Sequence, residues 1–375
     1  MIEVQDIFQN YGNAYIDKYK PPLHIQKVIR AILDCRTAVL GGHVDMCDEC
    51  GYNQISYNSC RNRHCPKCQA LSKERWVMAR QAELLPVTYF HVVFTLPSEL
   101  NMVVFQNQET LYNILLKAAQ ETVRELARDK KHLGAEIGLT SILHTWGQNL
   151  SFHPHVHMVI PGGGLTPDGR WQNSGKKFFL PVKVMAKKFR GKFLYYLKQA
   201  GLEFTGGQEY LKDAAQFDNL ISSLYRKDWY VYCKRPFKTT NSILEYLGRY
   251  THRIAISNHR IISCENGQVV FSWRDYRNGN KTKIMTLAAD EFIRRFLLHV
   301  LPPQFTKIRH YGFLASAVKS VKLALCRRLL FKIVPSASLP LSTVELILKL
   351  TGIDITICPV CGSPLSRASP GLLSA

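Results

Sequence analysis

The chain of 375 residues is long enough for two or three domains with hydrophobic cores. Its formal net charge of +21, from 49 Lys+Arg against 28 Asp+Glu, predicts a polyanionic partner: nucleic acid first, an anionic membrane surface as the alternative. No apolar run reaches the roughly 18 residues of a membrane-spanning helix. The first six residues lack the basic and apolar regions of a secretory signal, so we expect a cytoplasmic protein whose eleven cysteines bind metal or are buried thiols.

The first 40 residues are predicted to be helical, with a break at Pro21-Pro22, and the densest cysteine cluster follows them. Two pairs in this cluster form the pattern Cys-x2-Cys-x14-Cys-x2-Cys, one residue short of the usual zinc-ribbon spacing. Four thiolates around zinc make a closed structural site. We therefore expect one structural zinc ion on Cys47, Cys50, Cys65 and Cys68. Spare candidate ligands are Cys60, His64 and His43.

Three basic residues, Arg61, Arg63 and Lys67, lie within the same cysteine cluster. Positive charge beside a small zinc fold suits contact with phosphates, so these side chains are predicted to bind nucleic acid. Two other interpretations stay open: the charges are solvated, or they neutralise the negative charge of a four-thiolate site.

The next elements are a basic helix over residues 71–86, a strand over 88–96 and a helical stretch to about residue 130. Residues 139–161 then read as a hairpin that turns around residues 147–149. Pairing His144 with His155 places Ile142 opposite His157, with these side chains on one face.

The second strand of this hairpin carries three histidines at alternate positions, His153, His155 and His157, which therefore point to one face. Imidazoles at i and i+2 lie roughly 6–7 Å apart, close enough to share a divalent ion. The same pattern is compatible with an exposed histidine-rich strand that binds nothing. If a metal is bound, His144 and His153 are the candidates for its third ligand.

Further strands and helices are predicted in the second half of the chain. Residues 242–250 form a helical segment in which Tyr246 and Tyr250, at i and i+4, share a face beside Arg249 and Arg253. Tyrosines at this spacing are usually core residues, but both flanks of this segment are polar. The other predicted elements are a basic helix over 183–199, strands at 229–233, 253–257, 259–264 and 268–274, a helix at 288–300, a loop or short strand at 307–313 and a basic helix at 314–334.

A separate cysteine pair, Cys358 and Cys361, lies near the C-terminal end of the sequence. One Cys-x2-Cys pair is a weak signal, and two interpretations stay open. The pair is either half of a second zinc knuckle or two thiols without a ligand.

Three motifs occur in a fixed order: the cluster from Cys60 to Cys68, the triplet His155-Val156-His157, and the pair Tyr246-x3-Tyr250. Together they resemble the two-tyrosine HUH transposases of rolling-circle insertion sequences, the ninety-one type, over about residues 10 to 330. The resemblance implies an α+β fold, in which helices flank an antiparallel sheet of four or five strands with the histidine pair on a central strand. We expect an N-terminal helical and zinc-ribbon module in residues 1–85, the nuclease core in 86–312, and a basic helix and tail in 313–375.

The resemblance also implies roles for individual residues. His155 and His157 would bind a catalytic Mg²⁺ or Mn²⁺ ion, with His144 as the expected third ligand. Tyr246 and Tyr250 would be nucleophiles that cut and rejoin single-stranded DNA at element ends through a 5′-phosphotyrosine. Arg249 and Arg253 would contact that DNA. No Walker A motif is present, in agreement with a reaction that needs no nucleotide cofactor.

Two other functions are kept open. A metal-dependent hydrolase would also use a His-x-His pair, but Met158-Val159-Ile160 follow His157, where metallo-β-lactamase-like sites continue with Asp-His. A non-catalytic zinc-ribbon DNA-binding regulator explains the cysteines and the charge, but it leaves the histidines and tyrosines without a role.

Overall fold

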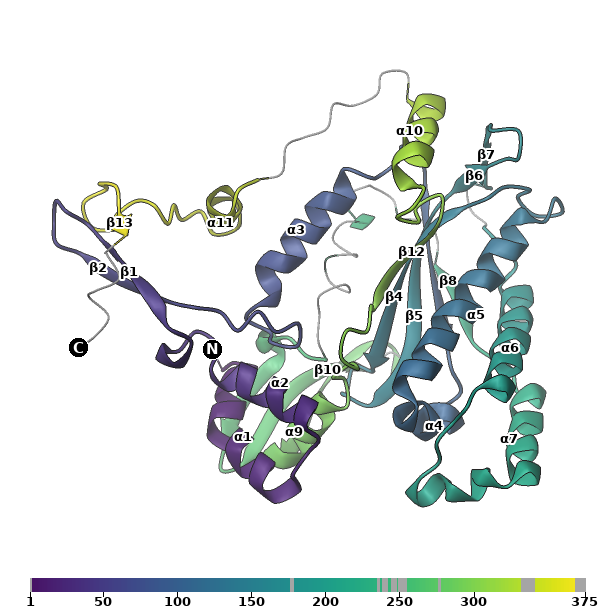
Figure 1. Ribbon diagram of the computed structural model, residues 1–375, viewed down its shortest axis with the longest axis horizontal. Coiled ribbons are helices and arrows are strands. Elements are labelled where there is room, and N and C mark those ends of the chain that lie inside the picture. Colours follow the sequence, from purple (N-terminus) through teal and green to yellow (C-terminus); the bar gives the residue numbers. More distant parts are fainter. Residues whose placement is uncertain are drawn as a thin grey trace. The chain divides into compact units, whose positions relative to one another are not determined.

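The computed structural model describes residues 2–175, 179–234, 237, 242–243, 248, 255–275, 278–331 and 341–367 (Figure 1). The chain forms two compact units. The N-terminal unit comprises Met1–Ala82, His252–Val300 and Ala337–Ala375, and the sheet unit comprises Glu83–Thr251 and Leu301–Ser336. The predicted nucleophiles Tyr246 and Tyr250 lie outside the described residues, as do Arg249 and Arg253.

These units correct the expected division at residues 85/86 and 312/313. The first unit boundary falls between residues 82 and 83, and residues 252–300 belong with the N-terminal unit and not with the core around the histidines. The tail also divides, because residues up to 336 join the sheet unit and those from 337 join the N-terminal unit. Linear segments could not reveal this, because pairings within each unit, such as Ile308 with Ile142 and Asp45 with Arg367, join residues more than 150 positions apart.

A five-stranded antiparallel sheet in the order β12-β4-β5-β3-β8 forms the centre of the sheet unit. Its strands are β3 (Tyr89–Thr95), β4 (Gly138–Trp146), β5 (Phe152–Pro161), β8 (Val231–Lys234) and β12 (Ile308–Gly312). The predicted hairpin is present as β4 and β5, and its register is confirmed: Ile142 pairs with His157, and His144 with His155. The histidine strand is thus the middle strand of the sheet, as the α+β fold expected from the sequence requires.

Period-two alternation gives this sheet one apolar face and one polar face. Alternate residues such as Val92, Phe94, Val156 and Met158 are buried in the main hydrophobic core. Two long helices, α5 (Gln108–Arg128) and α6 (Val182–Gln199), pack on one another and contribute to the same core (Figure 1). The histidines fall on the opposite face because they occupy the intervening positions of the strands.

Shorter elements complete the sheet unit. They are η2 (Ser98–Leu100), α4 (Asn101–Gln106), β6 (Gly163–Leu165), β7 (Trp171–Asn173), η3 (Gly206–Lys212), α7 (Ala214–Arg226) and α10 (Lys319–Leu330). The β6-β7 pair forms a small two-stranded sheet of its own. The predicted helix over 183–199 and the predicted strand at 88–96 both match the structure within about two residues.

The N-terminal unit contains two three-stranded sheets. One has the order β11-β10-β9, and the other has the order β13-β1-β2 and joins a strand near the C-terminal end of the chain to the N-terminal hairpin. The strands are β1 (Gly42–Met46), β2 (Asn53–Tyr57), β9 (Ile261–Glu265), β10 (Gln268–Asp275), β11 (Lys281–Ala288) and β13 (Ser366–Arg367). The helical elements are α1 (Val4–Tyr19), α2 (Leu23–Leu33), η1 (Ala38–Leu40), α3 (Gln69–Gln81), η4 (Asn258–Arg260), α9 (Ala289–Leu297) and α11 (Thr343–Thr351).

Aromatic packing joins α1 to α9 in this unit. The rings of Phe8 and Phe296 meet edge to face with their centroids 5.3 Å apart, and Phe292 packs on Phe271 of β10 at 5.9 Å. None of the helices in the described part of the chain is both long and apolar enough to cross a membrane.

Candidate active site and metal centres

Three histidines converge on the polar face of the central sheet. His155 and His157 come from β5 and His144 from the neighbouring strand β4, and one ring nitrogen of each lies within 4.8 Å of the others. The ring centroids of His144 and His157 are 4.4 Å apart, and those of His155 and His157 are 4.8 Å apart. The structure therefore brings together the three residues that the sequence nominated as metal ligands.

Contacts at Nδ1 orient two of these imidazoles, those of His155 and His157. His155 donates its Nδ1–H to the backbone carbonyl of His153 at 2.6 Å, because a carbonyl can only accept. His157 Nδ1 lies 2.8 Å from His91 Nε2. With Nδ1 of each ring in these contacts, His155 and His157 would bind a metal through Nε2.

Burial keeps the imidazoles of His155 and His157 neutral. It lowers the pKa of His155 from the ordinary value of 6.5 to about 3. Burial also holds the pKa of His157 well below 6.5, and the neighbouring rings of His144, His155 and His91 lower it further. Neutral imidazole is the metal-binding form, so at neutral pH no proton has to leave before a metal binds.

Two further histidines surround this site. His91 of β3 was missed from the sequence: it is buried, and its ring lies parallel to that of His157 with the centroids 5.1 Å apart. No local motif marks His91. A usable signal was its place among the odd-numbered residues of a strand whose even-numbered residues are apolar. His153, the alternative third ligand, instead supplies the carbonyl that orients His155.

This donor set fits a divalent ion on a polar surface. Three imidazole nitrogens favour Mn²⁺, Zn²⁺ and related transition metals on affinity, while Mg²⁺ prefers oxygen. Three ligands also leave coordination positions open for a substrate, as in catalytic sites and unlike closed structural ones.

The cysteines form two groups instead of the single expected one. In each group the four sulfur atoms lie within 4.8 Å of one another. The first group is Cys35, Cys60, Cys65 and Cys68, and the second is Cys47, Cys50, Cys358 and Cys361. The expected site on Cys47, Cys50, Cys65 and Cys68 is therefore wrong as a grouping, although each of the four cysteines belongs to one of the two groups.

The path of the backbone explains this correction. Cys47 and Cys50 lie at the turn between β1 and β2, and β2 then runs back beside β1 for five residues. A strand of that length covers about 17 Å, so the next cysteine, Cys60, lies at the far end of the hairpin. There it meets Cys35, which follows α2 and which no sequence spacing had marked.

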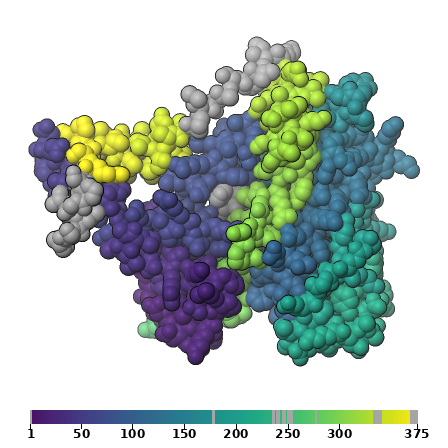
Figure 2. Space-filling model, in the orientation of Figure 1, coloured from purple at the N-terminus to yellow at the C-terminus, as the bar shows by residue number. Residues whose placement is uncertain are grey.

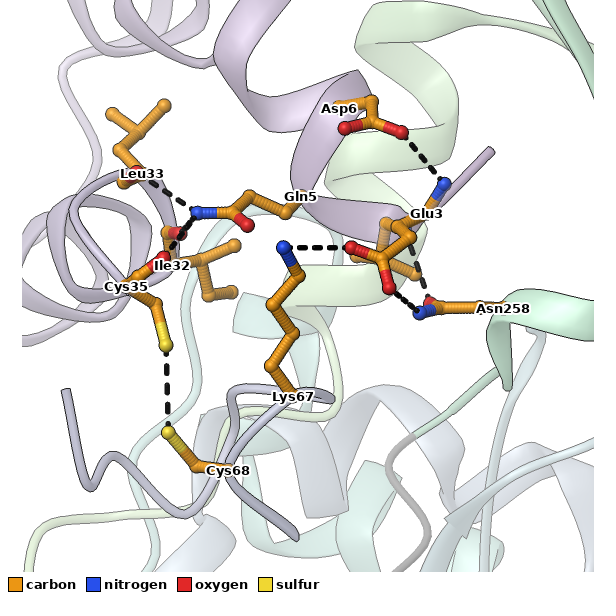
Figure 3. Close-up of polar contacts among 10 residues, drawn as sticks. Glu3, Gln5, Asp6, Ile32, Leu33, Cys35, Lys67, Cys68 and Asn258 are labelled. Atoms are coloured by element: carbon orange, nitrogen blue, oxygen red, sulfur yellow. Dashed lines mark hydrogen bonds and ion pairs between the residues drawn. The ribbon is translucent and has the colours of Figure 1, made fainter. Parts of the chain in front are cut away.

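The first cysteine group is anchored to the helices that precede it (Figure 3). The Gln5 side-chain amide donates to the carbonyls of Ile32, Leu33 and Cys35, and this bonding fixes the end of α2 and the backbone of Cys35. Cys35 Sγ then lies 3.5 Å from Cys68 Sγ, and Cys60 Sγ lies at the same distance from Cys68 Sγ. Sulfur atoms on a tetrahedral zinc ion lie about 3.8 Å apart, so the group has the spacing of a zinc site.

The predicted nucleic-acid contacts around this group differ in their surroundings. Arg61 is exposed, and Arg63 is half-buried with a pKa that burial lowers. Lys67 is paired with Glu3 of the segment before α1 at 2.8 Å, so its charge is balanced within the protein (Figure 3). Of the three, Arg61 has the environment most open to a phosphate.

Comparison with known proteins places the chain in a family. Residues 138–322 match the family described as "Putative transposase", and residues 7–96 match the "Transposase zinc-binding domain" of the IS91 type. The "Putative transposase y4qJ" of Sinorhizobium fredii (strain NBRC 101917 / NGR234) is 48% identical over 368 residues, which cover 96% of this chain and 92% of that protein. The "Transposase for insertion sequence element IS801" of Pseudomonas savastanoi pv. phaseolicola is 27% identical over 90% of this chain and 82% of its own.

The chain belongs to the IS91-type transposases with an N-terminal zinc-binding domain, and the family expected from the sequence is confirmed. It is thus a DNA transposase. Among solved structures, TrwC complexed with a 27-mer DNA comprising the recognition hairpin and the cleavage site aligns with 45% of this chain and 67% of its own, at 10% identity and a TM-score of 0.23.

Proposed function

We propose that this transposase cleaves and rejoins single-stranded DNA at the ends of a mobile element by tyrosine attack, in rolling-circle transposition. The observation that carries the proposal is the convergence of three imidazoles, two of them kept neutral by burial, on the polar face of the central sheet in a chain of this family. The basic charge of the chain supports a nucleic-acid substrate.

His144, His155 and His157 would hold a Mg²⁺ or Mn²⁺ ion. When bound, such an ion polarises the scissile phosphate and stabilises negative charge on the leaving 3′ oxygen. The three imidazoles contribute nitrogen donors; His91 orients the ring of His157, and the His153 carbonyl orients the ring of His155.

Tyr246 and Tyr250 are the proposed nucleophiles. A tyrosine phenol has a pKa near 10 and is a poor nucleophile at neutral pH, so its proton must be lost as it attacks. The new bond joins the phenol oxygen to the 5′ phosphate, the bond from phosphorus to the 3′ oxygen breaks, and the 3′ oxygen takes up a proton. The phosphotyrosine retains the phosphodiester energy, so a 3′-hydroxyl can reverse the step without a nucleotide cofactor.

We further propose that Cys35, Cys60, Cys65 and Cys68 hold a structural zinc ion. Four thiolates are a closed ligand set with no position for a substrate, which suits a folding role and not a catalytic one. Arg61 and Arg63, on the loop of this group, would contact DNA phosphates.

A covalent adduct tests the nucleophiles. A labelled single-stranded oligonucleotide carrying an element end is incubated with the protein and Mn²⁺ or Mg²⁺, and denaturing gels detect protein-linked DNA. We expect adduct with the unaltered protein and with the control Tyr195→Phe, whose exposed side chain lies on α6. We expect none with Tyr246→Phe/Tyr250→Phe.

The same assay separates the alternatives. Adduct in the double tyrosine variant would make the nucleophile assignment wrong, and cleavage without any adduct would favour a hydrolase that uses water. Normal cleavage by His155→Ala would reject the metal site. Binding without metal-dependent cleavage would favour the non-catalytic regulator.

A further inference from the structure

The second cysteine group joins two distant parts of the chain. Cys47 Sγ lies 3.4 Å from Cys361 Sγ, and Cys50 Sγ lies 3.6 Å from Cys358 Sγ. These distances are far too long for a disulfide bond of about 2.05 Å. They are close to the spacing of about 3.8 Å between thiolates on a tetrahedral zinc ion.

The two Cys-x2-Cys turns have the same backbone geometry. In the first, the Cys47 N–H donates to the Tyr52 carbonyl at 2.9 Å, and the Gly51 N–H donates to the Cys47 carbonyl at 3.0 Å. In the second, the Cys358 N–H donates to the Ser363 carbonyl at 2.8 Å, and the Gly362 N–H donates to the Cys358 carbonyl at 3.0 Å. Both glycines have positive φ, 73° at Gly51 and 78° at Gly362, a conformation that glycine adopts without strain. The repeat of one hydrogen-bonded turn indicates a pair of matched zinc knuckles.

Strand pairing brings the C-terminal knuckle to the N-terminal hairpin. Strand β13 adds to β1 as the third strand of the sheet, with Asp45 opposite Arg367 and Met46 opposite Ser366. Arg367 also approaches the Asp45 carboxylate at 3.7 Å, and its guanidinium lies 3.1 Å from His43 Nε2. Figure 2 shows the C-terminal segment, in yellow, against the purple hairpin of the same unit.

Apolar burial is too small to hold this assembly together. Residues 42–57 and 353–367 are all described, and Cys47 and Cys358 are the only buried ones among them, each 2% exposed. Large apolar side chains here, such as Ile55, Ile353 and Val360, are more than half exposed. A small sheet without a hydrophobic core needs another source of folding free energy, and metal binding can supply it.

We propose that Cys47, Cys50, Cys358 and Cys361 bind a second structural zinc ion, which assembles one zinc ribbon from the two ends of the chain. Half of this ligand set lies outside residues 7–96, the region that matches the zinc-binding domain family. The metal would attach the segment from α11 to β13 to the N-terminal hairpin, and the C-terminal cysteine pair would be a structural part of the N-terminal unit.

Zinc stoichiometry tests this proposal. The full chain is purified in a His155→Ala/His157→Ala background, so that the histidine site adds no zinc, and zinc per chain is measured by mass spectrometry. We expect two zinc ions per chain. Cys358→Ser/Cys361→Ser and Cys47→Ser/Cys50→Ser should each lose one, and the quadruple variant should also lose only one, because all four cysteines hold the same ion.

Matched control variants distinguish the loss of a zinc ligand from misfolding of the chain. Cys233→Ser/Cys264→Ser removes two half-buried cysteines outside both groups and should keep both ions. Cys361→His retains a zinc ligand and should also keep both. Full zinc content in Cys358→Ser/Cys361→Ser would overturn the proposal. Loss of both ions from that variant would also overturn it if Cys361→His loses both ions as well.

A mixing experiment tests whether the site forms within one chain. The Cys47→Ser/Cys50→Ser and Cys358→Ser/Cys361→Ser proteins are unfolded, mixed and refolded with zinc. We expect one zinc ion per chain, as for either variant alone. A gain in zinc on mixing would mean that the knuckles meet between chains, and the ribbon within one chain would be rejected.

Discussion

At the scale of single residues, the contact between His91 and His157 bears directly on the proposed metal site. If His157 is to bind through Nε2, its Nδ1 must carry the proton, and His91 Nε2 must accept it across their 2.8 Å contact. His91 is therefore a positioning residue that fixes the tautomer and ring plane of His157. Partners of this kind usually change metal affinity by 10–100-fold when they are removed.

Replacing His91 tests this role. We expect His91→Phe to weaken Mn²⁺ binding by about 10- to 100-fold, because the ring remains but the acceptor is lost. His91→Gln keeps an acceptor and should bind Mn²⁺ within a few-fold of the unaltered protein. Affinity is measured by Mn²⁺ electron paramagnetic resonance, with the exposed His132→Phe as control. Equal weakening of Mn²⁺ binding in the His91→Phe and His91→Gln variants would mean that His91 contributes only packing.

The lowered histidine pKa values predict how metal binding depends on pH. With a pKa of about 3, His155 stays in its neutral form at every pH above that value and loses it only as the pH falls through about 3. The pKa of His157 is lowered in the same direction. We therefore expect protonation of His155 and His157 to weaken Mn²⁺ binding by less than about twofold between pH 8 and pH 6, where two ordinary imidazoles would cost roughly 15-fold.

The measurement is the difference in bound Mn²⁺ at each pH between protein that carries zinc only at its cysteine sites and the His155→Ala variant of that protein. A loss near 15-fold would mean that the imidazoles titrate like exposed ones, and that burial does not keep them neutral.

At the scale of elements, the edge strand β12 depends on a glycine. Gly312 has a φ of 62°, and a Cβ atom at this position would overlap the carbonyl oxygen of Ile137. Gly312 also pairs with Gly138 at the end of β4, where a Cβ would meet the ring of Phe313. Two glycines opposite each other thus let β12 approach the strand that carries His144.

Substitution at Gly312 should destabilise this edge of the sheet. We expect Gly312→Ala to lower the free energy of unfolding by about 2 kcal/mol or more, from backbone strain and the clash together. Gly191→Ala is the matched control: it lies inside α6 with nothing near its Cβ, and it should raise stability by up to about 1 kcal/mol. Denaturant unfolding measures both, and a neutral Gly312→Ala would contradict the close approach of the two strands.

At the scale of the whole molecule, the net charge of +21 predicts strongly salt-dependent binding to DNA. Not every basic residue contributes equally, because some charges are already balanced within the protein. Lys67 pairs with Glu3, whereas Arg61 on the same loop is exposed.

This difference can be measured with single-stranded DNA. We expect Arg61→Ala/Arg63→Ala to reduce the slope of log affinity against log salt by roughly 1.4, about 0.7 for each lost phosphate contact. Lys67→Ala should leave the slope nearly unchanged. Fluorescence anisotropy over a range of salt concentrations measures the slopes, and a steeper loss for Lys67→Ala than for the arginine pair would reverse the assignment.

Local periodicity of the sequence predicts much of the fold. The strand at 88–96, the helix at 183–199 and the β4-β5 hairpin with its register were all predictable, because side-chain direction in a strand or helix follows from backbone geometry. The convergence of His144, His155 and His157 follows from that register alone. The domain boundaries were less accessible, because residues 252–300 return to the N-terminal unit.

The sequence by itself determined the histidine face of β5 and the family to which the chain belongs. Both depend on short motifs. The spacing of the residues in such a motif determines where their side chains lie on a strand or helix. Only the tertiary structure decided which cysteines meet and that His91 supports His157, because these pairings join residues up to 314 positions apart. The spacing of the cysteines predicted one partner pair for Cys47, but in the fold Cys47 lies with another pair. The reason is that strand β2 leads the chain away from Cys47 before the next cysteines occur.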